Sequence, residues 1–295
     1  MNLSILIPCY NWDIYNLVKE LHELCFTEKQ LNNFEIICIE DGSSQLFSNK
    51  QITQLQCVEY TKLPHNIGRS AIRNLLANKA QYEWLLFIDA DSKIKTQNFI
   101  KNYIEKTTKK HIIKNIYYGG TTYENNQFSK NQKLHYKYGK EIESNRKKNV
   151  FSSHHFLIHK TNFEKMKFDE KIKSYGYEDI LFQIKSNRNF IYIDNPLYHT
   201  GIKTTTNFIN DCESGLQNLI EYSYDKECVR NIKLLRLWNI VSIMKLSKMV
   251  LWIFEYLNPQ IIRNLHSSNP RLILFQFYKL GFFIKLKHML GKKTK

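Results

Sequence analysis

Short apolar runs alternate with amphipathic segments along the first two thirds of the chain. The runs cover residues 2–8, 34–39, 57–60, 84–88, 117–122, 151–158 and 190–193. Brief runs rich in aromatic and β-branched residues predict buried strands. Between them lie segments typical of helices, at 13–25, 66–79, 97–106 and 204–222. This order predicts an α/β fold with a doubly wound, mostly parallel sheet.

Polar residues follow several of these strands at the point where each strand ends. Tyr10 and Asn11 come after the first run, Asp41 after the second, and Asp89 and Asp91 after 84–88. In open α/β sheets, ligands bind beyond the carboxyl ends of the strands. Residues i and i+2 of an extended chain point to the same side. We therefore expect Asp89 and Asp91 to converge at this edge of the sheet.

Asp89 and Asp91 repel each other unless a positive group lies close to them. A divalent cation that carries a diphosphate is one such group, because Mg²⁺ binds one or two carboxylates together with phosphate oxygens. A solvated turn is the alternative for this pair taken alone. Arg69 and Arg73 are four residues apart, so they share one face of a helix. They can neutralise a diphosphate, orient Asp89 or form an ordinary surface salt bridge.

Four motifs, in this order, resemble those of family 2 glycosyltransferases with the GT-A fold. The motifs are Ile7-Pro8-Cys9-Tyr10-Asn11, Glu40-Asp41-Gly42-Ser43, Asn66-Ile67-Gly68-Arg69 with Arg73-Asn74, and Phe87-Ile88-Asp89-Ala90-Asp91. The resemblance covers about residues 1–205, and Glu40 departs from it by replacing the commoner first Asp. It implies an inverting, metal-dependent transferase of bacterial glycan synthesis. The donor is a nucleotide-sugar, with a UDP-sugar favoured. The donor-binding residues so implied are Pro8, Tyr10, Asn11, Asp41, Asn66, Gly68, Arg69, Arg73, Asp89, Ala90 and Asp91.

The resemblance also implies individual roles at the donor. Asp41 contacts the nucleobase, and Asp89 accepts from the ribose hydroxyls. Asp91 holds the cation, Mn²⁺ or Mg²⁺, that bridges the two phosphates. His199 is expected to return to this cation as a second ligand, so the expected metal site comprises Asp89, Asp91 and His199. Capping or acceptor binding is the alternative for His199.

Glu178 and Asp179 precede an apolar helical run and resemble the acidic pair that follows the metal site in many inverting members. By this resemblance, Asp179 is the base that deprotonates an acceptor hydroxyl, and Glu178 positions the acceptor. A positioned carboxylate can provide such general base catalysis. The alternative is plain N-terminal helix capping, since negative charge there is favoured by the helix dipole.

The net charge of +16 is concentrated near the C-terminus. Residues 226–295 contain 14 Lys and Arg against 2 Asp and Glu. Cations among Trp, Phe and Leu over 234–254 and 272–290 suit helices on an anionic membrane surface. Packing on the catalytic domain or on a second subunit, as a homodimer, is the alternative. No nucleic-acid motif accompanies the charge, so nucleic acid is not an expected partner.

These features predict a GT-A catalytic domain at 1–225 and a basic amphipathic helical region at 226–295. The N-terminus lacks the features of a signal peptide, and no stretch of about 18 uncharged apolar residues occurs. We expect a cytoplasmic protein, peripheral at the inner face of the cell membrane. Its expected reaction transfers a hexosyl group to a hydroxyl of a surface glycan or lipid-linked saccharide. The rivals are a catalytically inactive membrane-peripheral scaffold and a nucleotidyltransferase, which the lack of glycine in 7–11 disfavours.

Overall fold

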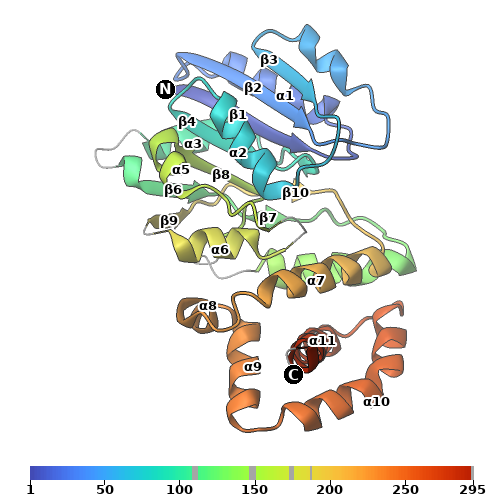
Figure 1. The fold of residues 1–295 in the computed structure, drawn as a ribbon. Helices are drawn as coiled ribbons and strands as arrows, with labels where there is room; N and C mark the ends of the chain where they lie inside the picture. Colours follow the sequence, from blue (N-terminus) through green and yellow to red (C-terminus); the bar gives the residue numbers. More distant parts are fainter. Residues whose placement is uncertain (108–111, 146–150, 173–175, 187, 294–295) are drawn as a thin grey trace. The chain divides into compact units, whose positions relative to one another are not determined.

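The computed structural model describes residues 1–107, 112–145, 151–172, 176–186 and 188–293 (Figure 1). Contacts along the chain group these residues into two compact units. The first contains the described residues of Met1–Glu124 with 151–172 and Lys185–Gly201. The second contains Asn125–Asn145, 176–184 and 202–293. The predicted domain boundary at residue 225 stays a prediction, and each unit is described by itself.

Seven strands among the described residues form the central sheet of the first unit, in the order β3-β2-β1-β4-β8-β6-β9. They are β1 (Asn2–Cys9), β2 (Asn33–Glu40), β3 (Val58–Lys62), β4 (Trp84–Ile88), β6 (Asn115–Tyr118), β8 (His155–His159) and β9 (Asn189–Tyr192). β1 runs parallel to β2 and β4, whereas β8 runs antiparallel to β4 and β6. The predicted mostly parallel sheet is confirmed. The carboxyl ends of β1, β2 and β4 share one edge, where the strand order reverses.

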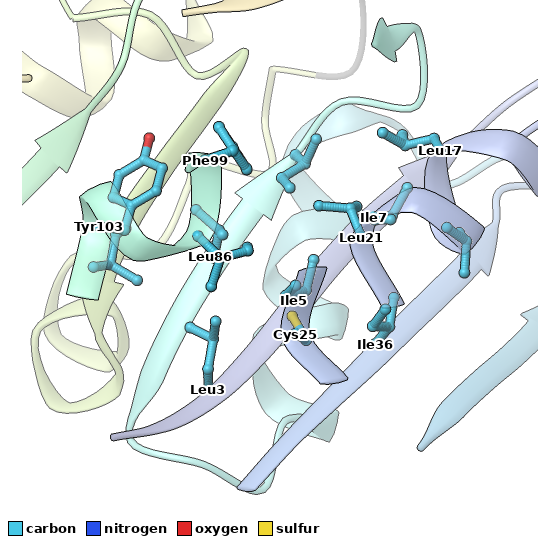
Figure 2. Packing of buried hydrophobic residues seen from close by; sticks show 14 of the residues in the cluster. Leu3, Ile5, Ile7, Leu17, Leu21, Cys25, Ile36, Leu86, Phe99 and Tyr103 are labelled. Atoms are coloured by element: carbon cyan, nitrogen blue, oxygen red, sulfur yellow. The ribbon is translucent and has the colours of Figure 1, made fainter. Parts of the chain in front are cut away.

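Helices α1 (Tyr15–Thr27) and α3 (Phe99–Thr107) pack against one face of this sheet. Leu3, Ile5 and Ile7 alternate along β1 toward that face, where they meet Leu21 of α1 and Phe99 of α3 (Figure 2). Full burial of one such side chain contributes about 1.5–3 kcal/mol. A shift of β1 by one residue would turn this set to the opposite face. The core therefore fixes where the residues that follow β1 lie.

Helix α2 (Arg69–Lys79) packs against β1 and β2. The first unit is completed by α5 (Lys160–Met166) and the short turns η1 (Asn49–Gln54) and η2 (Ile112–Lys114). A small second sheet contains β5 (Ser92–Lys93), β7 (Thr121–Thr122) and β10 (Leu197–His199). β10 is antiparallel to β5, which places His199 opposite Ser92. This pairing brings the end of the unit back beside Asp91.

The second unit is helical in its described residues. Its elements are η3 (Lys130–Gln132), α4 (Lys133–Tyr138), η4 (Gly139–Glu143), α6 (Glu178–Lys185), α7 (Thr205–Leu219), α8 (Lys226–Asn231), α9 (Lys233–Ile243), α10 (Ser247–Leu265) and α11 (Leu272–Lys293). α11 contacts α4, α7, α9 and α10. Gly281 permits a close approach of α10, because a Cβ there would lie 2.3 Å from the ring of Phe254. The C-terminal helices predicted from the sequence are thus present, and α11 is their central member.

Hydropathy and length single out no individual helix of the described chain as a candidate to cross a membrane. Among the described helices, α9 and α10 are long and apolar enough to cross a membrane only when they are counted together, and the chain bends by 118° between them.

Candidate functional site

Asp89 follows β4 directly and is held by two arginines of α2. Arg73 Nη2 donates to Asp89 Oδ1 at 2.7 Å, and Arg69 Nη2 lies 3.4 Å from Oδ2. The Arg73 side chain is 1% exposed, and its guanidinium carbon lies 5.3 Å from the centre of the Phe168 ring. Both arginines therefore contact Asp89, and their role toward a donor diphosphate stays a prediction.

Asp91 lies beside His199, although 108 positions separate them in the chain. His199 Nε2 is 3.1 Å from Asp91 Oδ2. The Thr200 N–H and hydroxyl both donate to the Asp91 carbonyl oxygen at 2.8 Å, which anchors the segment that carries His199. Gly201 completes this approach, because a Cβ there would lie 2.4 Å from Asp91 Oδ2. The sequence predicted that Asp91 and His199 come together, and the structure places them in contact.

The charge state of Asp91 depends on its neighbours. Burial acts to raise the pKa of this carboxyl, but the charge and hydrogen bond of His199, with smaller contributions from His154 and Arg69, hold the pKa well below its usual range. Asp91 is therefore a carboxylate at neutral pH. An ionised carboxylate is acceptor-only, so both oxygens suit a cation or a hydrogen-bond donor.

His154 belongs to this cluster, although its sequence context did not indicate it. Its Nε2 is 3.0 Å from Ser92 Oγ and its Nδ1 is 3.0 Å from Thr121 Oγ1. Its ring centre lies 5.6 Å from that of His199. In the sequence, the only indication was that His154 and His155 are adjacent in a predicted strand, so their side chains point to opposite sides. That indication could not show which histidine faces the site.

His155 has a structural role in the core of the first unit. Its Nε2 is 2.7 Å from the Gly120 carbonyl oxygen and its Nδ1 is 2.7 Å from the Tyr103 hydroxyl. In the neutral ring, Nε2–H donates to Gly120 and Nδ1 accepts from Tyr103. Burial is the main cause that lowers the pKa of His155 to about 3. His155 therefore remains uncharged in the folded protein at neutral pH.

Asp41 ties the loop after β2 to the start of α2. Its Oδ1 accepts the Ile67 N–H at 2.7 Å, and its Oδ2 accepts the Gly68 N–H at 3.1 Å. Asn66 donates to the Asp41 carbonyl oxygen at 3.1 Å. Gly68 has φ of +93°, a conformation that favours glycine. The contacts of Asp41 are thus made to backbone, and its predicted contact to a nucleobase stays a prediction.

The residues after β1 pack against the same loop. Asn11, at φ of +49°, donates its N–H to Ser43 Oγ at 2.8 Å, and its Oδ1 accepts the Gln45 N–H at 3.0 Å. Tyr10 is 53% exposed. Pro8 lies within β1, and Ala90 is buried between the two acids that follow β4. These residues lie at the expected edge of the sheet, and their binding roles stay predictions.

Glu40, the departure from the family motif, connects β2 to its neighbours. Its side chain is 2% exposed and accepts from the Tyr60 hydroxyl and from Asn49 Nδ2. Lys62 Nζ lies 3.4 Å from Glu40 Oε1. Burial acts to raise the pKa of Glu40, but these hydrogen bonds outweigh burial and lower it. Glu40 is therefore a buried carboxylate that joins β2 to β3.

Glu178 and Asp179 open helix α6 in the second unit. The buried Glu178 accepts the Gly176 N–H at 3.0 Å through Oε2, and Asp179 Oδ1 accepts the Ile180 N–H at 2.7 Å. The Ile180 N–H is a donor in the first turn of α6, as the capping alternative expects, whereas Gly176 lies before the helix. The catalytic roles of this pair stay predictions.

Comparison with known proteins settles the family. The sequence profile of glycosyl transferase family 2 matches residues 4–167, which is more than half of the 295 residues. The chain belongs to this family. No curated protein matches the sequence. The family predicted from the motifs is thus confirmed, and with it a glycosyltransferase.

Solved glycosyltransferase structures show the same fold. A mannosyltransferase from Pyrobaculum calidifontis, PcManGT, in complex with GDP-Man and Mn²⁺, is 10% identical with a TM-score of 0.58, over 96% of this chain and 84% of that one. S. aureus TarS 1–349 in complex with UDP-GlcNAc is 16% identical with a TM-score of 0.50, and the match covers 99% of this chain and 92% of that one. A longer TarS structure is 19% identical with a TM-score of 0.50, over 75% of this chain and only 40% of that one. The predicted GT-A fold is confirmed.

Asp91 and His199 are the residues of this family 2 chain that could hold a cation. Among the described residues, no group of three or more His, Cys, Asp and Glu side chains could hold a metal. Asp91 and His199 nevertheless present an oxygen and a nitrogen at one point. Mg²⁺ takes few protein ligands and completes its shell with substrate phosphates and water. Asp91 and His199 therefore fit a cation that arrives with a donor diphosphate, whereas both oxygens of Asp89 face arginines.

Proposed function

We propose that the chain is an inverting, metal-dependent glycosyltransferase that moves a sugar from a UDP-sugar to a hydroxyl of a surface glycan or lipid-linked saccharide. Family membership supports sugar transfer, and the UDP-GlcNAc of the TarS structure supports a uridine donor. The observation that most supports this location of the donor site is the 3.1 Å contact between His199 Nε2 and Asp91 Oδ2, beyond the carboxyl end of β4. Ligands of α/β sheets bind at such a position.

Asp91 and His199 would hold Mn²⁺ or Mg²⁺, and the Mn²⁺ of the PcManGT structure supports this assignment. When bound, the cation supplies charge that stabilises the departing nucleoside diphosphate. Asp89, fixed by Arg73, accepts from the ribose hydroxyls. Arg69 is 38% exposed, so its guanidinium can also face the diphosphate.

Asp179 accepts the proton of the acceptor hydroxyl as that oxygen attacks the anomeric carbon. Attack opposite the diphosphate inverts the configuration of the sugar. A carboxylate suits this task, because general base catalysis contributes about 10²–10⁴-fold to a rate. Glu178 positions the acceptor. Its Oε2 accepts the Gly176 N–H, which holds the turn next to Asp179.

Donor hydrolysis tests this proposal. The purified chain is incubated with a panel of nucleotide-sugars, with Mn²⁺, with Mg²⁺ or with chelator, and free nucleoside diphosphate is assayed. We expect release from one UDP-sugar that needs metal. Asp91→Asn and His199→Ala should each abolish release, whereas the exposed Asp194→Asn serves as a matched surface control in the same unit.

Calorimetry with UDP separates a weak enzyme from an inactive scaffold. Metal-dependent UDP binding that is lost in Asp91→Asn supports the assigned site even where hydrolysis requires an acceptor. If no nucleotide binds with or without metal, the assignment of Asp91 and His199 is wrong. The scaffold alternative would then lead.

A further inference from the structure

Helix α9 has an outer apolar face that no described element covers. Leu234, Leu235 and Trp238 are buried, and Trp238 packs on Phe283 of α11 with ring centres 5.7 Å apart. The opposite side exposes Leu237, Ile240, Ile243 and Met244, of which Ile243 is 71% exposed. Exposed apolar residues scattered singly are normal, but a contiguous group indicates an interaction surface.

Helix α10 repeats this arrangement after the 118° bend. Its inner face buries Leu251, Phe254, Ile261 and Leu265, and the ring centre of Phe254 lies 5.7 Å from that of Tyr278 of α11. Its outer face exposes Met249, Trp252 and Tyr256, at i, i+3 and i+7. The rings of Trp252 and Tyr256 stack with centres 6.0 Å apart, yet both are about two-thirds exposed. Packing within the unit thus explains the inner face of α10 but not the outer face.

We call the exposed apolar residues around the bend the corner patch: Ile240, Ile243, Met244, Met249 and Trp252. The cations Lys245 and Lys248 are exposed among them. Residues 226–256 contain six Lys and Arg against two acids, Glu227 and Glu255. An apolar surface on which cations outnumber acids complements a bilayer whose surface is negative.

A basic pocket lies beside the corner patch. It has a volume of about 450 Å³, and its lining includes Ser223, Tyr224, Lys226, Arg230, Arg236 and Asn239. Lys287 contacts two of these lining residues, since its Nζ donates to Ser223 Oγ at 2.9 Å and lies 4.0 Å from the centre of the Tyr224 ring. Arg236 and Ile240 are one turn apart on α9, so the pocket and the corner patch adjoin.

We propose that this surface docks on an anionic lipid bilayer, with lipid phosphate groups in the basic pocket and the corner patch in the interfacial layer. Three guanidinium or ammonium groups without a carboxylate in the lining are suited to a phosphate. Trp and Tyr are favoured at the water–lipid boundary, where one end of the ring system is apolar and the other is wet. The inference goes beyond the proposed transferase reaction and does not depend on it.

Vesicle flotation tests the docking. The full-length chain is mixed with phosphatidylcholine vesicles, with or without phosphatidylglycerol. We expect binding only to the anionic vesicles, and weaker binding at higher salt. The pocket variant Arg230→Gln/Arg236→Gln should bind about 25-fold more weakly, at about fivefold for each cation removed. The matched charge control, Lys29→Gln/Lys79→Gln, removes two exposed lysines of the first unit and should bind as the wild type does.

The corner patch is tested with Ile243→Gln/Met244→Gln, which should weaken binding about tenfold or more. The matched apolar control is Phe26→Gln/Leu46→Gln, at residues 70% and 90% exposed in the first unit. Thermal melting establishes that each variant is folded, and donor hydrolysis without vesicles should be unchanged in all of them. A loss of hydrolysis would concern the proposed function alone.

Three results would overturn the docking proposal. The first is equal binding to neutral and anionic vesicles. The second is wild-type binding by both the pocket and the patch variants. The third is a dimer in light scattering that Ile243→Gln/Met244→Gln converts to a monomer while no vesicle binds, which would make the corner patch a subunit interface.

Discussion

Replacing Arg73 with Met should remove the closer of the two cations that hold Asp89. Met keeps most of the volume and the contact with Phe168, because its thioether packs well on aromatic rings. The variant therefore removes charge and hydrogen bonding but leaves little cavity. Arg69→Met is the matched control, since Arg69 contacts the same carboxylate from one helical turn earlier.

The expected magnitude follows from burial and distance. Removing one partner of a buried ion pair costs about 3–5 kcal/mol. Arg73 is 1% exposed and 2.7 Å from Asp89, but Arg69 remains at 3.4 Å and offsets part of the loss. We expect Arg73→Met to lower the free energy of unfolding by about 2–3 kcal/mol. Arg69 is 38% exposed, so Arg69→Met should cost less than about 1 kcal/mol.

Urea unfolding followed by circular dichroism measures both losses, and a double-mutant cycle with Asp89→Asn isolates each pair. We expect a coupling energy of about 2 kcal/mol between Arg73 and Asp89 and a much smaller one for Arg69. UDP calorimetry is the second readout. If Arg73 acts by orienting Asp89, Arg73→Met should weaken UDP binding to the same degree as Asp89→Asn.

Equal losses for the two arginine variants would refute the argument from burial. A coupling energy near zero would show that Arg73 stabilises the fold by packing instead of through Asp89. Unchanged UDP binding in Arg73→Met, alongside lost binding in Asp89→Asn, would show that Asp89 needs no orienting partner.

Three further predictions concern the core and the loops. The pKa of His155 is lowered to about 3, so below about pH 6.5 the unfolded chain binds a proton that the folded chain does not. The free energy of unfolding should therefore fall by about 2 kcal/mol between about pH 7.5 and pH 5. Urea unfolding measures this slope, and His155→Gln should flatten it. Asp41→Asn should cost about 1–3 kcal/mol in the same assay, since an amide cannot accept from both backbone N–H groups, and Asp194→Asn should be neutral. Gly201→Ala should lower donor hydrolysis about 100-fold with little change in melting temperature, because its methyl group displaces Asp91.

The strands that position the site were predictable from local sequence. β1, β2 and β4 are short apolar runs that end in polar residues, and burial on both faces requires that pattern. The antiparallel place of β8 between β4 and β6 was not predictable, because strand pairing is decided by tertiary packing. The 2.4 Å approach that requires Gly201 also arises only when β10 returns to β5.

Side-chain partners were harder to predict than positions. The hydrogen bonds from Asp41 to two backbone N–H groups at the start of α2 were not predicted, and its contact to a nucleobase stays a prediction. The sequence did not explain why Glu40 replaces the commoner Asp of the family motif. In the structure, the longer side chain of Glu40 contacts Tyr60 and Lys62 of β3. The apolar residues of α11 suggested a membrane surface, but contacts on several sides make α11 the central helix of its unit. A helix that is apolar all round is usually buried.

The two acids after β4 lie in different electrostatic environments. Asp89 and Asp91 would repel each other at close range, and the fold gives each a different positive neighbour. Arg73 cannot lose its proton, so a metal that approaches Asp89 meets a permanent positive charge. His199 can offer a neutral ring nitrogen, which is a common metal ligand. In the proposed site, a cation is therefore repelled from Asp89 and accepted at Asp91, which leaves Asp89 to hydrogen-bond the sugar of the nucleotide.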